Sequence, residues 1–164
     1  ASYHLICREA IGLNGGGVMP SSRESFWEDQ DGYAVVGHSG RRAFPRLTYR
    51  GLKKLGKTVY AVDPAGETVE GDASFRDLAS LPGPVSAAVL EVPKDETAEW
   101  VRRVADAGIR SVWIHQQTDT PEALQLAEER GLQVCSGTCA VMYVTPGVSP
   151  HMFHRWVMKL GKKY

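Results

Sequence analysis

The sequence is short of the features that mark membrane and secreted proteins. No apolar run approaches the roughly 18 residues that a membrane-spanning helix requires, and the first residues lack the basic start and apolar centre of a secretory signal. Cysteine is scarce as well, because Cys7, Cys135 and Cys139 are too few and too unevenly spaced for a disulfide framework. We therefore expect free thiols and a cytoplasmic protein with no membrane partner.

An excess of charge of either sign is also missing. The 164 residues include 19 basic and 19 acidic side chains, which leaves a formal net charge of zero. No overall field then recruits nucleic acid, so any binding has to be local. The length suits one ordinary domain with a real core and leaves too little chain for a comfortable second one. We expect a single domain with no nucleic-acid partner.

The two ends differ in composition from the middle. Residues 1–18 finish in the cluster Asn14-Gly15-Gly16-Gly17 and are interpreted as a vector-derived leader. A phosphate-binding loop is the weaker alternative, because neither a preceding strand nor a following helix is convincing there. Residues 19–145 form the expected domain. Residues 146–164 form a C-terminal extension, whose amphipathic helix over 151–160 is expected to dock on the domain or on a second copy in a homodimer.

Short β-rich apolar runs alternate with helical segments from Tyr33 onward. This pattern predicts an α/β, Rossmann-like three-layer domain with a mostly parallel sheet and helices on both faces. The predicted strands cover 33–37, 58–62, 85–92, 111–115, 132–135 and 140–144. The predicted helices cover 47–55, 74–80, 95–107 and 121–130. Capping patterns support the helices that begin near Ser74 and Thr120, and Gly108 and Gly131 suit helix C-termini.

The chemistry of such a fold is expected at one edge of the sheet, because ligands of open α/β sheets bind beyond the carboxyl ends of the strands. The turn Gly37-His38-Ser39-Gly40 follows the first strand and leads into a helix, with Arg41, Arg42 and Arg46 nearby. Glycine permits close backbone approach, and arginines and helix amides favour an anion. These residues predict a pyrophosphate site, and a purely structural turn is the alternative.

The end of the second strand supports two readings. Asp63 stands roughly where a dinucleotide-binding fold carries an acidic residue for a ribose hydroxyl, which favours NAD. Pro64 holds Asp63 in extended geometry and forms a sharp exit, which instead suits the wall of an adenine pocket. A carboxylate pointing at the ligand favours NAD, whereas arginines at the phosphates and an adenine slot at Pro64 favour coenzyme A (CoA).

The order of these pieces resembles the CoA-binding domain proteins, which are related to the nucleotide-binding domain of the succinyl-CoA synthetase alpha subunit. The resemblance runs from about Phe26 to Val144. It is carried by Val35-Val36-Gly37-His38-Ser39, Val59-Tyr60-Ala61-Val62-Asp63-Pro64, Val89-Leu90-Glu91-Val92-Pro93, Ala107-Gly108-Ile109-Arg110-Ser111-Val112-Trp113-Ile114 and the region of Cys139.

The resemblance implies a position for each part of CoA. The phosphates lie at Gly37 to Ser39 with help from an arginine, the adenine lies near Val62 to Pro64, and the pantetheine arm passes Val92 to Lys94. It also implies no catalytic activity, because small family members lack the catalytic and ATP-handling domains of the synthetase. The chain departs from the family at Ser136-Gly137-Thr138-Cys139, where small members often carry aspartate-arginine-cysteine.

Sharper chemistry finds little support in the sequence. Cys135 and Cys139 with His151 and His154 lack the spacing of a zinc site, so we expect no metal. His38 and His115 end strands and are read as structural, while Glu91 and Asp119 lack identifiable catalytic partners.

We therefore predict non-catalytic binding of CoA or an acyl-CoA, as a carrier or sensor. The alternatives are an NAD(P)-binding protein or oxidoreductase, and a protein-interaction module with a vestigial pocket. The residues expected to bind the cofactor are Gly37, His38, Ser39, Arg41, Arg46, Val62, Asp63, Pro64, Val92, Pro93, Lys94, Gln116 and Gln117, with Cys139 as a contact for the thiol.

Overall fold

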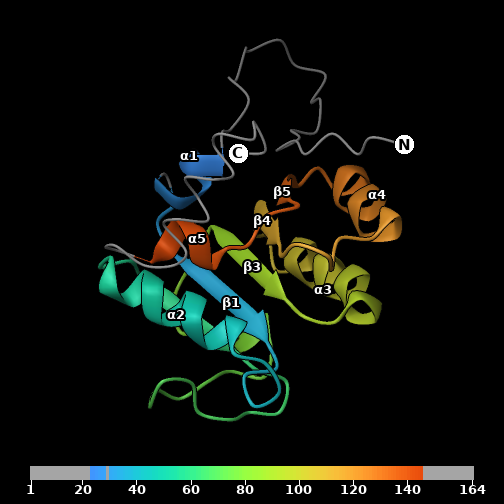
Figure 1. Cartoon of the computed structure of the whole chain (residues 1–164). Helices are drawn as coiled ribbons and strands as arrows, with labels where there is room; N and C mark the ends of the chain where they lie inside the picture. The colour runs from blue at the N-terminus through green and yellow to red at the C-terminus, as the bar shows by residue number, and fades with distance from the viewer. Residues whose placement is uncertain (1–22, 29, 146–164) are drawn as a thin grey trace.

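A computed structural model describes residues 23–28 and 30–145. Its elements, in chain order, are α1 (Arg23–Glu28), β1 (Tyr33–Gly37), α2 (Phe44–Lys54), β2 (Val59–Val62), the 3₁₀ helix η1 (Leu78–Ser80), β3 (Ala87–Glu91), α3 (Lys94–Asp106), β4 (Ser111–Ile114), α4 (Pro121–Glu129), β5 (Gln133–Ser136) and α5 (Val141–Val144). The strands form one parallel sheet in the order β2-β1-β3-β4-β5 (Figure 1). The predicted Rossmann-like α/β class is confirmed.

Each face of the sheet carries its own apolar core. Val36, Leu90 and Ile114 pack with the buried side chains of α3 and α4. Val35 and Val89 pack on the other face with residues of α1, α2 and α5, because successive strand residues face opposite sides. All five residues of β1 and of β3 are buried, as is usual for strands of a parallel sheet that is covered on both faces.

Trp113 of β4 anchors the layer formed by α1 and α5. Its ring is fully buried and lies 4.8 Å from the ring of Trp27 and 5.0 Å from that of Tyr143, measured between centroids. Phe26 adds a third aromatic contact at 5.4 Å. Offset and edge-on aromatic pairs of this kind add about 0.5–1.5 kcal/mol each beyond burial. Trp27 and Trp113 therefore serve the packing of the core.

Two of the predicted helices differ in the structure: the one between β1 and β2 and the one between β2 and β3. Helix α2 begins at Phe44 rather than at residue 47, with Pro45 in its first turn, where a missing N–H does no harm. The segment 74–80 forms only the short η1, because Asp77 caps it by accepting a hydrogen bond from Ser80 N (2.8 Å). Ser74 Oγ donates to the carbonyl of Glu67 instead of capping a helix.

The predicted sixth strand is wrong, since Val141–Val144 is a short helix. A Cβ on Gly51 of α2 would lie 2.4 Å from the carbonyl oxygen of Val144, so α5 rests directly on the backbone of α2. This contact, and the burial of Val144 in the core of that face, outweigh the β propensity of the segment.

The predicted leader over 1–18 and the C-terminal helix over 151–160 lie outside the described residues. Within the part of the chain that the structure describes, no helix is long and apolar enough to cross a bilayer.

Candidate functional site

The sheet has a topological switch point between β1 and β3. Strand β1 is followed along the chain by its neighbour β2 on one side, and the next strand, β3, lies on the other side of β1. Loops leaving β1 and β3 diverge at such a point and leave a crevice in which ligands of open α/β folds bind. The carboxyl ends of these strands therefore carry the candidate site.

Gly37 ends β1 at this point and is required by the packing of the protein itself. A Cβ there would lie 2.4 Å from Pro45 Cγ and 2.9 Å from the carbonyl oxygen of Glu91. The first turn of α2 and the end of β3 thus meet across the hydrogen of Gly37. The sequence attributed this glycine to the approach of a ligand, whereas the structure shows that it serves the approach of helix to strand.

Asp63 holds the loops after β1 and β2 together. Its Oδ2 accepts hydrogen bonds from Ser39 N (2.9 Å) and from Ser39 Oγ, and its Oδ1 accepts one from Ala65 N (2.9 Å). Asp63 is 1% exposed and Ser39 is 3% exposed. The carboxylate is therefore turned inward, and both the amide and the hydroxyl of Ser39 donate hydrogen bonds to it.

The rest of the turn after β1 leads into a helix start that lacks a side-chain cap. The carbonyl of His38 accepts hydrogen bonds from Arg41 N (3.0 Å) and Arg42 N (3.1 Å), and His38 Nε2 lies 2.7 Å from the nearer carboxylate oxygen of Glu96. The N-cap of α2 is Ala43, and the first turn contains no acidic residue. This end of α2, beside exposed arginines, favours an anion.

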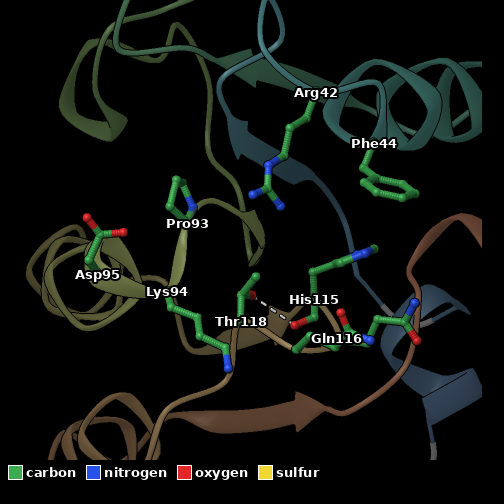
Figure 2. A pocket seen from close by; sticks show the side chains of 9 residues that line it. Arg42, Phe44, Pro93, Lys94, Asp95, His115, Gln116 and Thr118 are labelled. Carbon is green, nitrogen blue, oxygen red and sulfur yellow. Dashed lines mark hydrogen bonds between the residues drawn. The ribbon is translucent and has the colours of Figure 1, made fainter.

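A cavity of about 460 Å³ opens beside this helix start. Its walls come from the loops after β1, β3 and β4, and its lining residues are Arg42, Phe44, Pro93, Lys94, Asp95, His115, Gln116, Gln117 and Thr118 (Figure 2). Thr118 Oγ1 donates to the carbonyl of His115 (2.8 Å), which closes the turn after β4. Gln117 in that turn has φ of +67°, so the backbone is bent sharply over the cavity.

A family model described as a CoA binding domain matches residues 31–145. The chain belongs to the CoA-binding domain family. No curated protein sequence matches it.

Solved structures resemble this CoA-binding domain over most of its length. A hypothetical protein from Pyrococcus horikoshii OT3 is 25% identical, with a TM-score of 0.65, and the match covers 73% of this chain and 84% of that one. A Thermus thermophilus protein, cell-free ID.343, is 22% identical, with a TM-score of 0.64, covering 73% and 91% of the two chains. A dinucleotide-forming acetyl-coenzyme A synthetase from Ca. Korarchaeum cryptofilum, 20% identical, with a TM-score of 0.57, covers 70% of this chain and 29% of its own. The likenesses under 25% identity support the fold alone.

Beside the cavity of the CoA-binding domain lies a buried pair that the sequence did not reveal: His115, which lines the cavity, and Glu91, which does not. Glu91, at the end of β3, accepts a hydrogen bond from Thr48 Oγ1 (2.8 Å) on its Oε1. The same Oε1 lies 3.3 Å from His115 Nδ1 at the end of β4. Glu91 therefore has partners, contrary to expectation. Strands β3 and β4 are parallel neighbours, so Glu91, which ends β3, and His115, which directly follows β4, lie side by side. The order of the predicted strands along the chain is the feature of the sequence from which this pairing could have been inferred.

The structure collects only some of the predicted binding residues around the cavity. Pro93, Lys94, Gln116 and Gln117 line it, whereas the remaining predicted residues do not contribute to its lining. Val62 and Val92 are buried in the core, and Arg46 is exposed on α2, where its charge acts on Glu70. The binding residues predicted from the sequence did not include His115, which was read as structural, nor Arg42, Phe44, Asp95 and Thr118. Starting α2 three residues earlier would have placed Phe44 at this edge.

The cysteines divide into two kinds in the described part of the chain. Cys139 is a free and buried thiol, and burial raises its pKa to about 11, with a further contribution from the charge of Glu91. The expectation of a free thiol is wrong for Cys135, which is disulfide-bonded. The cysteine pattern therefore does not support a reducing compartment. Among the described residues no cluster of His, Cys, Asp and Glu is arranged to hold a metal ion, and His151 and His154 lie outside them.

Proposed function

We propose that this domain binds CoA or an acyl-CoA across the carboxyl edge of the sheet, as a carrier or sensor that catalyses no reaction of its own. The observation that carries the proposal is the cavity at the β1–β3 switch point, which joins two cationic side chains, Arg42 and Lys94, to the first turn of α2. An exposed aromatic ring, Phe44, stands at the same place, with 37% of its surface open to solvent. The cavity therefore combines positive charge that suits the phosphates of CoA with an apolar surface that suits its pantetheine arm.

The strand order gives such a ligand a direction. Adjacent strands lie about 4.8 Å apart, so β2 and β4, three spacings apart, are separated by about 14 Å along the edge. An adenine near Pro64 at the end of β2 then places the phosphates at the start of α2 and leads the pantetheine arm past Pro93 toward β4. In this arrangement Gln116 and Gln117 offer amide groups to the amide bonds of the arm.

The inward position of Asp63 favours CoA over a nicotinamide dinucleotide. Both carboxylate oxygens of Asp63 accept hydrogen bonds from the protein, and the side chain is buried. A ribose hydroxyl would have to replace Ser39 or Ala65 as a donor. A binding role without catalysis is supported by Cys139, since a thiol with a pKa of about 11 supplies almost no nucleophilic thiolate at neutral pH.

Isothermal titration calorimetry with CoA, acetyl-CoA, NAD and NADP tests the proposal. We expect both CoA forms to bind, and we expect Arg42→Ala and Lys94→Ala each to weaken the affinity by roughly tenfold, since a charge-assisted contact to phosphate contributes on the order of 1–2 kcal/mol. Arg130→Ala is the matched control, because Arg130 is also an exposed arginine, lies just after the end of α4 outside the cavity lining, and pairs with Asp106. Binding of NAD without binding of either CoA form would overturn the proposal.

A further inference from the structure

The pair formed by Glu91 and His115 has hydrogen-bonding capacity that the protein does not use. Glu91 is 4% exposed and His115 is 6% exposed. Within the described residues, Glu91 Oε2 and His115 Nδ1 make no hydrogen bond, although Nδ1 lies 3.3 Å from Glu91 Oε1. Buried polar groups are nearly always paired, so two unsatisfied atoms side by side require an explanation. Core packing alone would be served better by an apolar pair.

The imidazole is positioned for a ligand in the cavity. His115 lines the cavity, and because its Nδ1 lies nearest Glu91, we assign Nε2 as the ring nitrogen that meets a bound molecule. The ring of Phe44 lies against it at 4.9 Å between centroids, which restrains its orientation (Figure 2). A carboxylate close to one ring nitrogen favours the charged imidazolium, and a second nitrogen turned to a reactant can then accept its proton.

We propose that His115, supported by Glu91, accepts the proton of the terminal thiol of bound CoA, so that the site holds the free cofactor as a thiolate and discriminates against its thioesters. The inference rests on the proposed function, in which the arm crosses from β1 toward β4 and ends where His115 lies. The S–H bond of the ligand breaks, an N–H bond forms at His115 Nε2, and the resulting thiolate pairs with the imidazolium. No oxidant or further reactant is needed.

The surrounding charges allow this ion pair. Arg42 from the β1–α2 loop and Lys94 from the start of α3 line the same cavity and favour a thiolate, while Asp95 beside them opposes it. Glu91 stabilises the imidazolium from below. Cys139, after β5, also feels the charge of Glu91 but keeps its proton, so it does not compete for the imidazole. A thioester has no proton to give and forms no such pair.

The thiol of the bound cofactor is therefore expected to titrate lower than that of free CoA. The ultraviolet absorbance of the thiolate is followed from pH 5.5 to about 9 for the full chain saturated with CoA, and the complex with desulfo-CoA, which lacks the sulfur, is subtracted as a blank. An ordinary thiol titrates near 8.5, and we expect the bound thiol to titrate roughly one to two units lower. Because the proton stays in the complex, calorimetry over the same range should show that the affinity for CoA relative to desulfo-CoA and acetyl-CoA is highest between the pKa values of an ordinary imidazole and an ordinary thiol, about 6.5 and 8.5, and falls on either side.

Two substitutions separate proton transfer from a merely structural role. His115→Gln should return the bound thiol to its ordinary pKa and abolish the difference in affinity between CoA and desulfo-CoA, and Glu91→Gln, which keeps an acceptor for Thr48, should remove part of both effects. A bound thiol that titrates like free CoA in the unaltered protein, with equal affinities for CoA and desulfo-CoA at every pH, would overturn the inference and leave the proposed function standing. Failure of both CoA and desulfo-CoA to bind would overturn the proposed function itself.

Discussion

Replacing Asp63 by asparagine distinguishes two roles of the carboxylate: holding the loops after β1 and β2 together, or binding the ribose hydroxyl of a dinucleotide. The carboxylate accepts three hydrogen bonds, from Ser39 N, Ser39 Oγ and Ala65 N. Asparagine keeps one acceptor oxygen and presents an NH₂ group to at least one of these donors. Hydrogen bonds to a charged group contribute about 1.5–3 kcal/mol, and a buried donor left without an acceptor adds a desolvation penalty. We therefore expect Asp63→Asn to lower the free energy of unfolding by about 3 kcal/mol.

Urea unfolding followed by circular dichroism measures this loss. With a slope of about 2 kcal/mol per molar urea, 3 kcal/mol moves the midpoint down by about 1.5 M. Asp77→Asn is the matched control, because Asp77 also accepts a backbone hydrogen bond but is exposed, and it should cost less than about 1 kcal/mol. Ser39→Ala combined with Asp63→Asn should be less harmful than the sum of the two, since the pair shares one interaction.

The opposite result would refute the reasoning. If Asp63→Asn unfolded at the same urea concentration as the unaltered protein and lost only the binding of NAD, the carboxylate would be a ligand group, and the inward geometry would not describe its role.

Two further predictions concern Gly37 and Cys139. Gly37→Ala should destabilise the protein by more than about 2 kcal/mol in the same urea assay, because its Cβ would lie 2.4 Å from Pro45 Cγ, and a loss under 0.5 kcal/mol would show that helix and strand part easily. Cys139 should react with iodoacetamide at pH 8 roughly 100-fold more slowly than an ordinary thiol, measured by peptide mass spectrometry, because its pKa rises from 9.0 to about 11. Because the pKa of Cys139 is raised in the folded protein, its contribution to the free energy of unfolding is fully present below about pH 9 and is lost as pH rises through about 11. A fast reaction with iodoacetamide at pH 8 would contradict the raised pKa and this pH dependence.

The fold could be predicted from the sequence wherever burial on both faces left a clear pattern. The apolar runs that became β1 and β3 are strands buried from end to end. Thr120 caps α4 by accepting a hydrogen bond from Ala123 N (3.1 Å), and Gly108 adopts φ of +75° after α3, both as their residue types predict. Local chemistry determines such features, so a local reading finds them.

The failures lie where a distant partner decides the outcome. Val141–Val144 has the composition of a strand, but its conformation is set by α2, whose Gly51 is far away in sequence. Ser74 resembles a helix cap until the carbonyl of Glu67 takes its hydroxyl. Rules based on the spacing of neighbouring residues do not predict contacts between segments that are distant in the sequence.

The same reasoning explains why the residues predicted from the sequence lie at the edge of the sheet that carries the cavity, although most of them do not line it. A glycine turn and an acidic residue at the ends of neighbouring strands have the residue types of a ligand site, and here those types serve the protein: Gly37 admits Pro45, and Asp63 binds Ser39. Among the described residues that line the neighbouring cavity, His115 is the one with a buried nitrogen that makes no hydrogen bond. In a sheet of this kind, a polar group with all its partners supports the site, and a buried polar group without them is the better candidate to meet the ligand.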